Sequence, residues 1–187
     1  ISASGSFQGP ADGPPAIPYQ SVVLIASDVR NGGVVGVYRG FQEAARKMGW
    51  SLRLYDGQGQ EDRIARLFDK AIAQHPDGIV INGFDAKNYR PQVKAARAAD
   101  IALVGWHASS FPGPTSELFA NVTTDPLEVA ELAAQFVIRN ARADDRSVGV
   151  VIFTDSNFGI ARTKTTALKK TIERCDGYHG CKVLSIE

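Results

Sequence analysis

The hexapeptide NGGVVG at residues 31–36 is the first stretch whose residue types and spacing suggest chemistry. It matches a dinucleotide-binding glycine fingerprint except that Asn31 replaces the first glycine, and Asp56 stands about 20 residues further on, where such sites carry a ribose-binding carboxylate. Four residues, however, separate the preceding apolar run from the loop, and Asp28 would place a negative charge beside a phosphate. We therefore expect glycines that let the backbone turn and approach a cleft closely, with a nucleotide site as the alternative.

Catalytic motifs are otherwise absent from the sequence. Gly-Lys-Ser, Gly-Lys-Thr and the Gly-x-Ser-x-Gly elbow do not occur, and His75, His107 and His179 stand too far apart for a metal or nucleophile motif. Asp125 and Asp155 follow strand ends, where a carboxylate more often binds hydroxyl groups or caps a helix than acts as a base. The sequence favours a non-enzymatic protein without a cofactor or metal.

Composition and charge argue against two classes of partner. The 21 Lys and Arg residues nearly balance the 20 Asp and Glu residues, so there is no electrostatic case for nucleic acid. No run approaches the roughly 18 apolar residues that span a bilayer. Residues 1–19 are rich in Gly, Pro, Ser and Ala, which predicts an extended or disordered lead-in and is incompatible with a helix-turn-helix.

Cys175 and Cys181 are the only cysteines in the sequence. Two glycines between them let the intervening turn fold back, so a disulfide is geometrically easy. Free thiols are the alternative, whereas a zinc site is disfavoured because only His179 lies beside the pair. A bridge would stabilise the fold by about 2 kcal/mol on the chain-entropy model and would indicate an oxidising compartment.

Hydrophobic periodicity predicts the elements that must position these residues. Short apolar runs alternate with helical patterns, as in consecutive βα units. Strands are predicted at residues 21–26, 51–55, 78–82, 101–106, 118–122, 147–153 and 182–186, and helices after most of them, including 88–99, 125–140 and 158–173. This alternation predicts an α/β fold with a doubly wound parallel sheet.

Two helix ends carry clear signals. The first helix should bury a stripe made of Val37, Phe41, Ala44, Ala45 and Met48. Gly49 follows this stripe and is predicted to be the C-cap. Asp125 and Pro126 predict a helix start, because aspartate accepts hydrogen bonds from free N–H groups and proline loses nothing at the first helical position.

Several segments together carry a resemblance to a known family. They are VVLIASDVRNGGVVGVYRGFQEAARKMGWSLRLYDGQGQEDR, PDGIVINGFDAKNYRPQVKAARAADIALVGW, NVTTD and GIARTK, and their full order is more specific than any one of them. Across residues 21–187 the chain resembles the type I periplasmic binding proteins, the ribose-binding and related sugar-binding group. The effector domains of LacI-type repressors share the same fold.

The resemblance implies two Rossmann-like lobes joined by a hinge, with a small ligand held in the cleft at the strand ends. We expect an extended segment at residues 1–19, a ligand-binding lobe at 20–124 and a partial second lobe at 125–187. The second lobe has about one and a half βα units, fewer than such a lobe needs. It is therefore expected to be incomplete here, and the biological protein is expected to continue beyond Glu187.

Candidate ligand contacts follow from position at the strand ends and from the resemblance. They are Asp28, Arg30, Asn31, Asn82, Phe84, Asp85, Trp106, His107, Asp125, Asp155, Phe158 and Arg162. Within this set, the resemblance places Asp85 at a polar cleft position and Arg162 at an arginine that hydrogen-bonds sugar hydroxyls.

Two departures from the ribose-binding pattern bear on the ligand. Gly33 and Val34 stand where those proteins carry a pair of stacking aromatic residues, and Trp106 and His107 stand where they carry an acidic residue followed by arginine. Trp106, or a phenylalanine at position 84 or 158, could supply a replacement platform for a sugar face. Alternatively, the ligand is not an ordinary monosaccharide.

The resemblance implies a secreted or periplasmic solute-binding protein. Such a protein captures a small polar, sugar-like ligand for an ABC transporter permease and binds no nucleic acid. A ligand-sensing domain of a receptor or of a LacI-type regulator is the second hypothesis, and an NAD-dependent oxidoreductase built on the glycine loop is the third.

Overall fold

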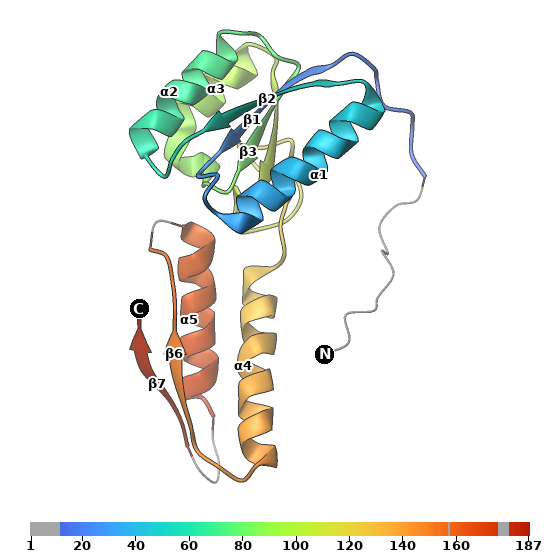
Figure 1. Ribbon diagram of the computed structural model, residues 1–187. Coiled ribbons are helices and arrows are strands. Elements are labelled where there is room, and N and C mark those ends of the chain that lie inside the picture. Colours follow the sequence, from blue (N-terminus) through green and yellow to red (C-terminus); the bar gives the residue numbers. More distant parts are fainter. Residues whose placement is uncertain (1–11, 157, 176–179) are drawn as a thin grey trace.

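The first five strands form one parallel sheet in a computed structural model that describes residues 12–156, 158–175 and 180–187 (Figure 1). The strand order is β2-β1-β3-β4-β5, with β3 in the centre between β1 and β4. The strands are β1 (Ser21–Ala26), β2 (Ser51–Asp56), β3 (Gly78–Asn82), β4 (Ala102–Trp106) and β5 (Ala120–Val122). All four pairings are parallel, which confirms the predicted fold class.

Helices cover both faces of this sheet. They are α1 (Gly32–Met48), α2 (Glu61–Ile72), a 3₁₀ helix η1 (Ala86–Tyr89) and α3 (Arg90–Ala98). In β1, Leu24 packs in the cluster beneath α1, whereas its neighbours Val23 and Ile25 pack in the cluster that includes Phe68 of α2. The alternation of side chains along a strand thus serves two cores, as a doubly wound sheet requires. We call this unit, β1 to β5 with its helices, the N-terminal lobe.

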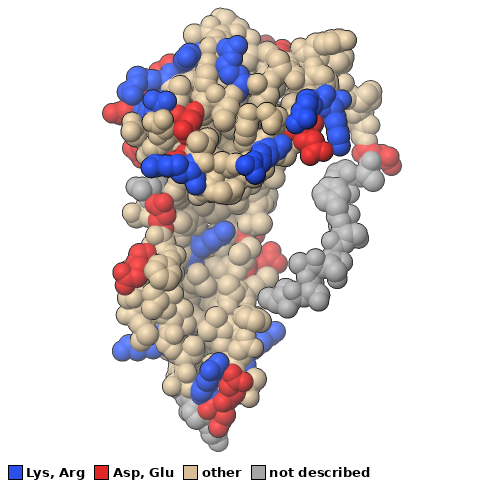
Figure 2. Space-filling view, in the orientation of Figure 1, with Lys and Arg blue, Asp and Glu red and all other residues tan. Residues whose placement is uncertain are grey.

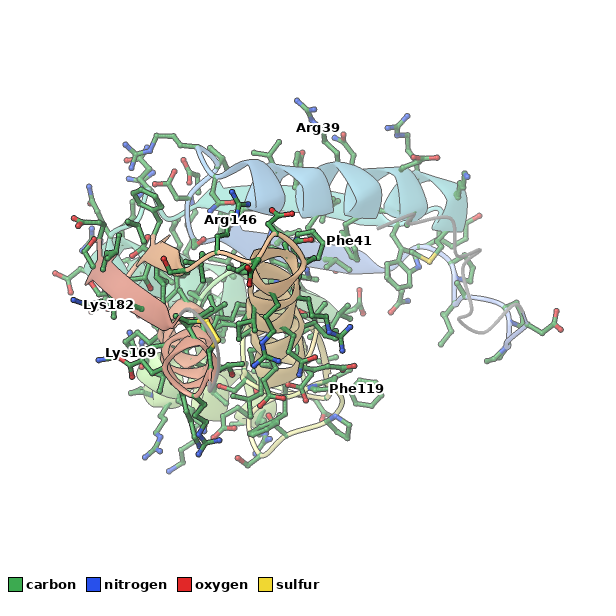
Figure 3. The ribbon with its side chains drawn as sticks, turned by 90° about the horizontal axis from the view of Figure 1, so that it is seen from below. Arg39, Phe41, Phe119, Arg146, Lys169 and Lys182 are labelled. Atoms are coloured by element: carbon green, nitrogen blue, oxygen red, sulfur yellow. A yellow bond between two sulfur atoms is a disulfide. The ribbon has the colours of Figure 1, made fainter. Side chains whose placement is uncertain are left out.

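Helix α1 ends as predicted but is oriented slightly differently. Gly49 is left-handed at φ 69° and donates its backbone N–H to carbonyls of the last turn, so the predicted C-cap is confirmed. Ala44 was expected on the buried stripe and is exposed. Tyr38 packs against the core instead, and Phe41 points from α1 toward the sheet (Figure 3).

The turn after β1 corrects one expectation. The glycines of residues 31–36 do not form it, because Gly32 begins α1 and all three glycines lie inside this helix without positive φ. The backbone turns one step earlier, where the N–H of Asn31 donates to the carbonyl of Asp28 at 3.1 Å. The side chain of Asn31 then caps α1 by accepting from the N–H groups of Gly33 and Val34.

The remaining elements form a second unit, which we call the C-terminal lobe. It contains α4 (Pro126–Ala143), β6 (Val148–Ile152), α5 (Gly159–Glu173) and β7 (Cys181–Ile186). Strands β6 and β7 form a parallel pair, and α4 and α5 pack side by side (Figures 1 and 3). Among the described residues this sheet has no third strand.

The predicted disulfide joins Cys175, after the end of α5, to Cys181 at the start of β7, with 5.6 Å between the Cα atoms. The loop between them includes His179, which lies outside the described residues.

The lead-in at residues 1–19 is described only from residue 12. From there to residue 17 it has no regular secondary structure and is exposed. One hydrogen bond ties its described part to the residue before β2: the indole N–H of Trp50 donates to the carbonyl of Ile17 at 2.7 Å. Trp50 lies before β2, at the amino ends of the parallel strands.

Candidate functional site

The two lobes meet where the strands of the first sheet end and α5 begins. A small pocket there is lined by residues of both lobes: Phe84, Asp85, His107, Ser109 and Ser110 from the first, and Phe158, Gly159 and Ile160 from the second. A groove of about 560 Å³ continues from Asp85 along α5, past Arg162. Five of the predicted contacts therefore come together at this junction: Phe84, Asp85, His107, Phe158 and Arg162.

Asp85 and Arg162 approach the same point from opposite lobes. Asp85 caps η1 with one oxygen, which accepts from the N–H of Lys87 at 2.9 Å. Its other oxygen, Oδ2, lies 3.4 Å from where a Cβ on Gly159 would stand, and Nη2 of Arg162 lies 3.6 Å from that point. Arg162 also donates to the carbonyl of Ser156.

Gly159 is the first residue of α5, and this helix start has no side-chain cap. The first N–H groups of a helix lack partners within the helix and carry its positive dipole end. The junction therefore combines an acceptor, a cationic donor and backbone donors within a few ångströms. Hydroxyl groups of a polar ligand can use all three, because a hydroxyl both donates and accepts.

Trp106 ends β4 and lies over the first turn of α1. Its Cη2 atom is 3.4 Å from where a Cβ on Gly33 would stand. The indole is partly buried against the core that contains Val34, and its centroid lies 4.2 Å from that of the His107 ring. The backbone at Gly33 is therefore approached closely by an aromatic side chain that comes from another strand, β4.

His107 joins the cleft to the connection between the lobes. Its Nδ1 lies 2.5 Å from Oγ1 of Thr123, which precedes α4, and its backbone N–H donates to the carbonyl of Val122. Burial lowers the pKa of His107, and the positive charge of Lys164 on α5 lowers it further. The imidazole is therefore neutral at pH 7 and serves as a hydrogen-bonding group rather than a cation.

Asp28 and Arg30 pair with each other. Nη2 of Arg30 lies 2.6 Å from Oδ2 of Asp28, and hydrogen bonds from Arg30 lower the pKa of that carboxyl. The pair lies next to Gly59, in the loop after β2. Both groups are thus directed to the β2 edge of the sheet rather than to the junction.

Three further predicted contacts lie at helix starts or in the turn before one. Asn31 caps α1, and Asp125 caps α4 by accepting from the N–H groups of Leu127 and Glu128. Asp155 is exposed in the turn before α5. The aspartate and proline at residues 125 and 126 thus form the helix start that the sequence predicted.

Asn82 is fully buried and ties β3 to α1. Its Nδ2 donates to the carbonyl of Val34 at 3.1 Å. Its Oδ1 and the hydroxyl of nearby Ser27 have no partner among the described residues. Asn82 therefore fixes the first turn of α1, which is the surface that Trp106 covers.

Sequence reasoning missed the serines of the loop after β4. Asn121, a buried polar residue in β5, accepts from the N–H of Ala108 and donates to the carbonyls of Ser109 and Phe111. These bonds hold Ser109 and Ser110 at the junction. The available signal was the asparagine itself, because a polar residue inside an apolar strand must find partners.

Lys, Arg, Asp and Glu are interspersed on the face shown in Figure 2. In the described ranges, no helix is both long and apolar enough to cross a bilayer. The same ranges contain no group of three or more His, Cys, Asp or Glu residues placed to hold a metal ion.

Comparisons with known proteins agree with this architecture. The model of the family described as a periplasmic binding protein domain matches residues 22–186. The ribose import binding protein RbsB of Bacillus subtilis is 25% identical over 117 residues, which are 63% of this chain and 37% of that protein.

Two solved structures share the fold. A solute-binding protein from Burkholderia graminis in complex with D-arabinose has a TM-score of 0.75 at 18% identity, covering 94% of this chain and 57% of that one. The 5-methylthioribose transporter solute-binding protein of Thermotoga lettingae has a TM-score of 0.73 at 18% identity, covering 89% and 50%. The chain thus spans between 37% and 57% of the length of these three relatives.

Proposed function

The chain belongs to the periplasmic binding protein family, and we propose that it is a non-enzymatic solute-binding protein that holds a small polar ligand, a sugar or polyol, between its lobes. One observation carries the proposal: Asp85 of the first lobe and Arg162 of the second converge on the start of α5. A carboxylate, a guanidinium and the backbone N–H groups of a helix start together match the donors and acceptors of neighbouring hydroxyls.

Closure of the lobes follows from contacts on both sides of the ligand. A ligand that touches Asp85 and Arg162 at once favours the state in which the lobes approach, because it gains both contacts only there. We place the boundary at residues 124 and 125, between a lobe at 20–124 and one at 125–187. The segment at Thr123 connects the two lobes and would act as the hinge, and the hydrogen bond between His107 and Thr123 would hold it in place.

The ligand-loaded protein would present its cargo to an ABC transporter permease, from the periplasm or another extracytoplasmic location. Two observations support this setting. The similar proteins described above include an import binding protein and a transporter solute-binding protein. The Cys175–Cys181 disulfide suits an oxidising compartment.

Calorimetric titration with D-ribose, L-arabinose, D-galactose, glycerol and NAD tests the proposal. We expect a neutral sugar or polyol to bind and NAD not to bind. Arg162→Ala and Asp85→Asn should each weaken that ligand by more than tenfold, because each leaves ligand hydroxyls without a partner. Arg146→Ala removes an exposed arginine that pairs with Asp144 after α4, and it should leave affinity unchanged. Binding of NAD alone, or of no neutral ligand, would contradict the proposal.

A further inference from the structure

We propose that Gly33 and Trp106 form a matched pair that selects uncharged sugars or polyols carrying an apolar substituent, such as a deoxy, alkyl or thioalkyl group. The apolar part of the ligand would pack on the indole of Trp106. This inference rests on the proposed function, because it names the ligand class for the same cleft.

The indole occupies the space that a side chain at position 33 would need. A Cβ on Gly33 would lie 3.4 Å from Cη2 of Trp106 and 3.2 Å from Oδ1 of Asn31. A methyl group would touch both atoms, so a side chain at position 33 has little room on the side that faces the indole. By contrast, Gly36, one turn along the same helix, has nothing within 4 Å of its Cβ position. The requirement for glycine is therefore specific to the position beneath the indole.

Hydrogen bonds hold the first turn of α1, against which the indole of Trp106 lies. Asn31 holds the first turn of α1 through the N–H groups of Gly33 and Val34. Asn82 of β3 holds the carbonyl of Val34 at 3.1 Å. Because the helix start is tied at both points, it cannot move away to admit both a side chain and the indole. The ring is thus a rigid surface at the carboxyl end of the central strands.

The aromatic ring beside Trp106 is uncharged. The ring of His107, 4.2 Å away, stays neutral at pH 7 because burial lowers its pKa. The cation of Arg30 is paired with Asp28 beside the loop after β2. From the N-terminal lobe, the imidazole of His107, Ser109, Ser110 and Asp85 line the small pocket, and Trp106 adjoins this pocket through its ring contact with His107.

This combination divides the cleft by chemistry. The polar end at Asp85 and Arg162 suits hydroxyl groups, and the aromatic end at Trp106 suits carbon or sulfur atoms. In an apolar pocket, one added methylene is worth about tenfold or more in discrimination.

Matched ligand pairs test the inference by calorimetry. D-Ribose is compared with 5-methylthioribose, and D-galactose with its 6-deoxy analogue. We expect the apolar-substituted member of at least one pair to bind tenfold or more tightly. Trp106→Ala should reduce that preference to less than threefold while D-ribose or D-galactose still binds, and Trp106→Phe should retain most of it. Trp50→Phe, which changes the tryptophan at the other end of the sheet, should leave the preference intact.

Gly33→Leu provides an independent test that leaves Trp106 in place. Leucine favours helix over glycine, so Gly36→Leu should raise the melting temperature, whereas Gly33→Leu should lower it and abolish the preference by displacing the indole. Equal affinities within both ligand pairs, or a preference that survives Trp106→Ala and Gly33→Leu, would overturn this inference and leave the proposed function standing. Failure of every sugar and polyol to bind would overturn both.

Discussion

The two lobes are built from the same alternation of strand and helix, yet they bury their side chains to very different extents. In the N-terminal lobe, five successive residues of β1 are buried, because helices cover both faces of the sheet. In the C-terminal lobe, β7 alternates partly buried and exposed residues along its whole length. Local sequence pattern therefore predicts the element, while neighbours on both faces determine how much it stabilises the fold.

Helix α4 makes the contrast sharper. Val129, Leu132 and Phe136 are spaced three and four residues apart, as on a buried helix face, but they are between 40% and 58% exposed. Ala130 and Ala134 on another face of the same helix are buried. Helix α4 thus has one apolar face that is covered and one that no described residue covers.

The largest difference between the lobes should appear when a phenylalanine is truncated in each. Phe68 of α2 is 0% exposed and Phe136 of α4 is 51% exposed. Phe68→Ala should cost about 3 to 5 kcal/mol, because it leaves a cavity in a closed core, and Phe136→Ala should cost much less. Urea denaturation followed by circular dichroism measures both. Equal losses would mean that the exposed face of α4 is covered in solution, which would break the comparison.

Removal of the disulfide should act on the C-terminal lobe alone. Cys175 and Cys181 are six residues apart, and the chain-entropy model gives about 2 kcal/mol for so short a loop. In the Cys175→Ser/Cys181→Ser variant, amides of α5 and β7 should exchange hydrogen faster. Amides of β1 and β3 should keep their protection, because those strands are buried in the other lobe. Faster exchange in β1 would show that the lobes unfold as one unit.

Helix caps should be worth the same in both lobes, because a cap depends on local geometry and not on the size of the core. Asn31→Ala removes the acceptor at the start of α1, and Asp125→Ala removes the one at the start of α4. Each should lose about 1 kcal/mol of stability. Thermal melts of the two variants test this, and a cap that matters in only one lobe would mean that tertiary contacts dominate it.

The smallest expected effect is the pH dependence of stability that comes from His107, which contacts the segment between the two lobes. His107 contacts Thr123 and lies near Lys164, and burial lowers the pKa of its imidazole in the folded chain. Between this lowered pKa and the pKa of the unfolded chain, the unfolded chain therefore binds a proton at His107 that the folded chain does not. The corresponding stability is complete above the ordinary histidine pKa of about 6.5 and is lost as pH falls through the lowered folded value.

Urea midpoints at pH 7.5 and pH 5.5 test this linkage. The drop in midpoint should be smaller in His107→Gln than in the unmodified chain. His75→Gln, at an exposed histidine near the opposite ends of the strands, should not reduce the drop. An unchanged drop in His107→Gln would assign the acid sensitivity to other groups.

Strands with continuous apolar runs could be predicted to the residue. Residues 21–26 and 78–82 form β1 and β3 with the predicted bounds, because buried central strands need apolar side chains on both faces. The glycine loop could not be read correctly, since three glycines argue against helix by propensity. The cap that overrides this preference was visible only as a single asparagine, Asn31.

The strand-end residues of the site were also predictable, but their pairing was not. Position at strand ends led us to expect Asp85 and Trp106 near a cleft, since parallel strands end at one edge of a sheet, and the family resemblance pointed to Asp85 and Arg162. Sequence could not indicate that Asp85 faces Gly159 across the lobes or that Trp106 covers Gly33. Such contacts depend on distances between segments that are far apart in the chain.

The two tryptophans give the molecule a built-in optical reporter. Trp106 is at the carboxyl end of β4 beside the cleft, whereas Trp50 is bonded to Ile17 at the amino ends of the strands. Variants that keep one tryptophan each separate the fluorescence of the two indoles. The fluorescence of Trp50 then serves as a reference that does not depend on occupancy of the cleft. A blue shift or quenching that disappears in Trp106→Phe and persists in Trp50→Phe would follow occupancy of the cleft in real time, without an attached dye.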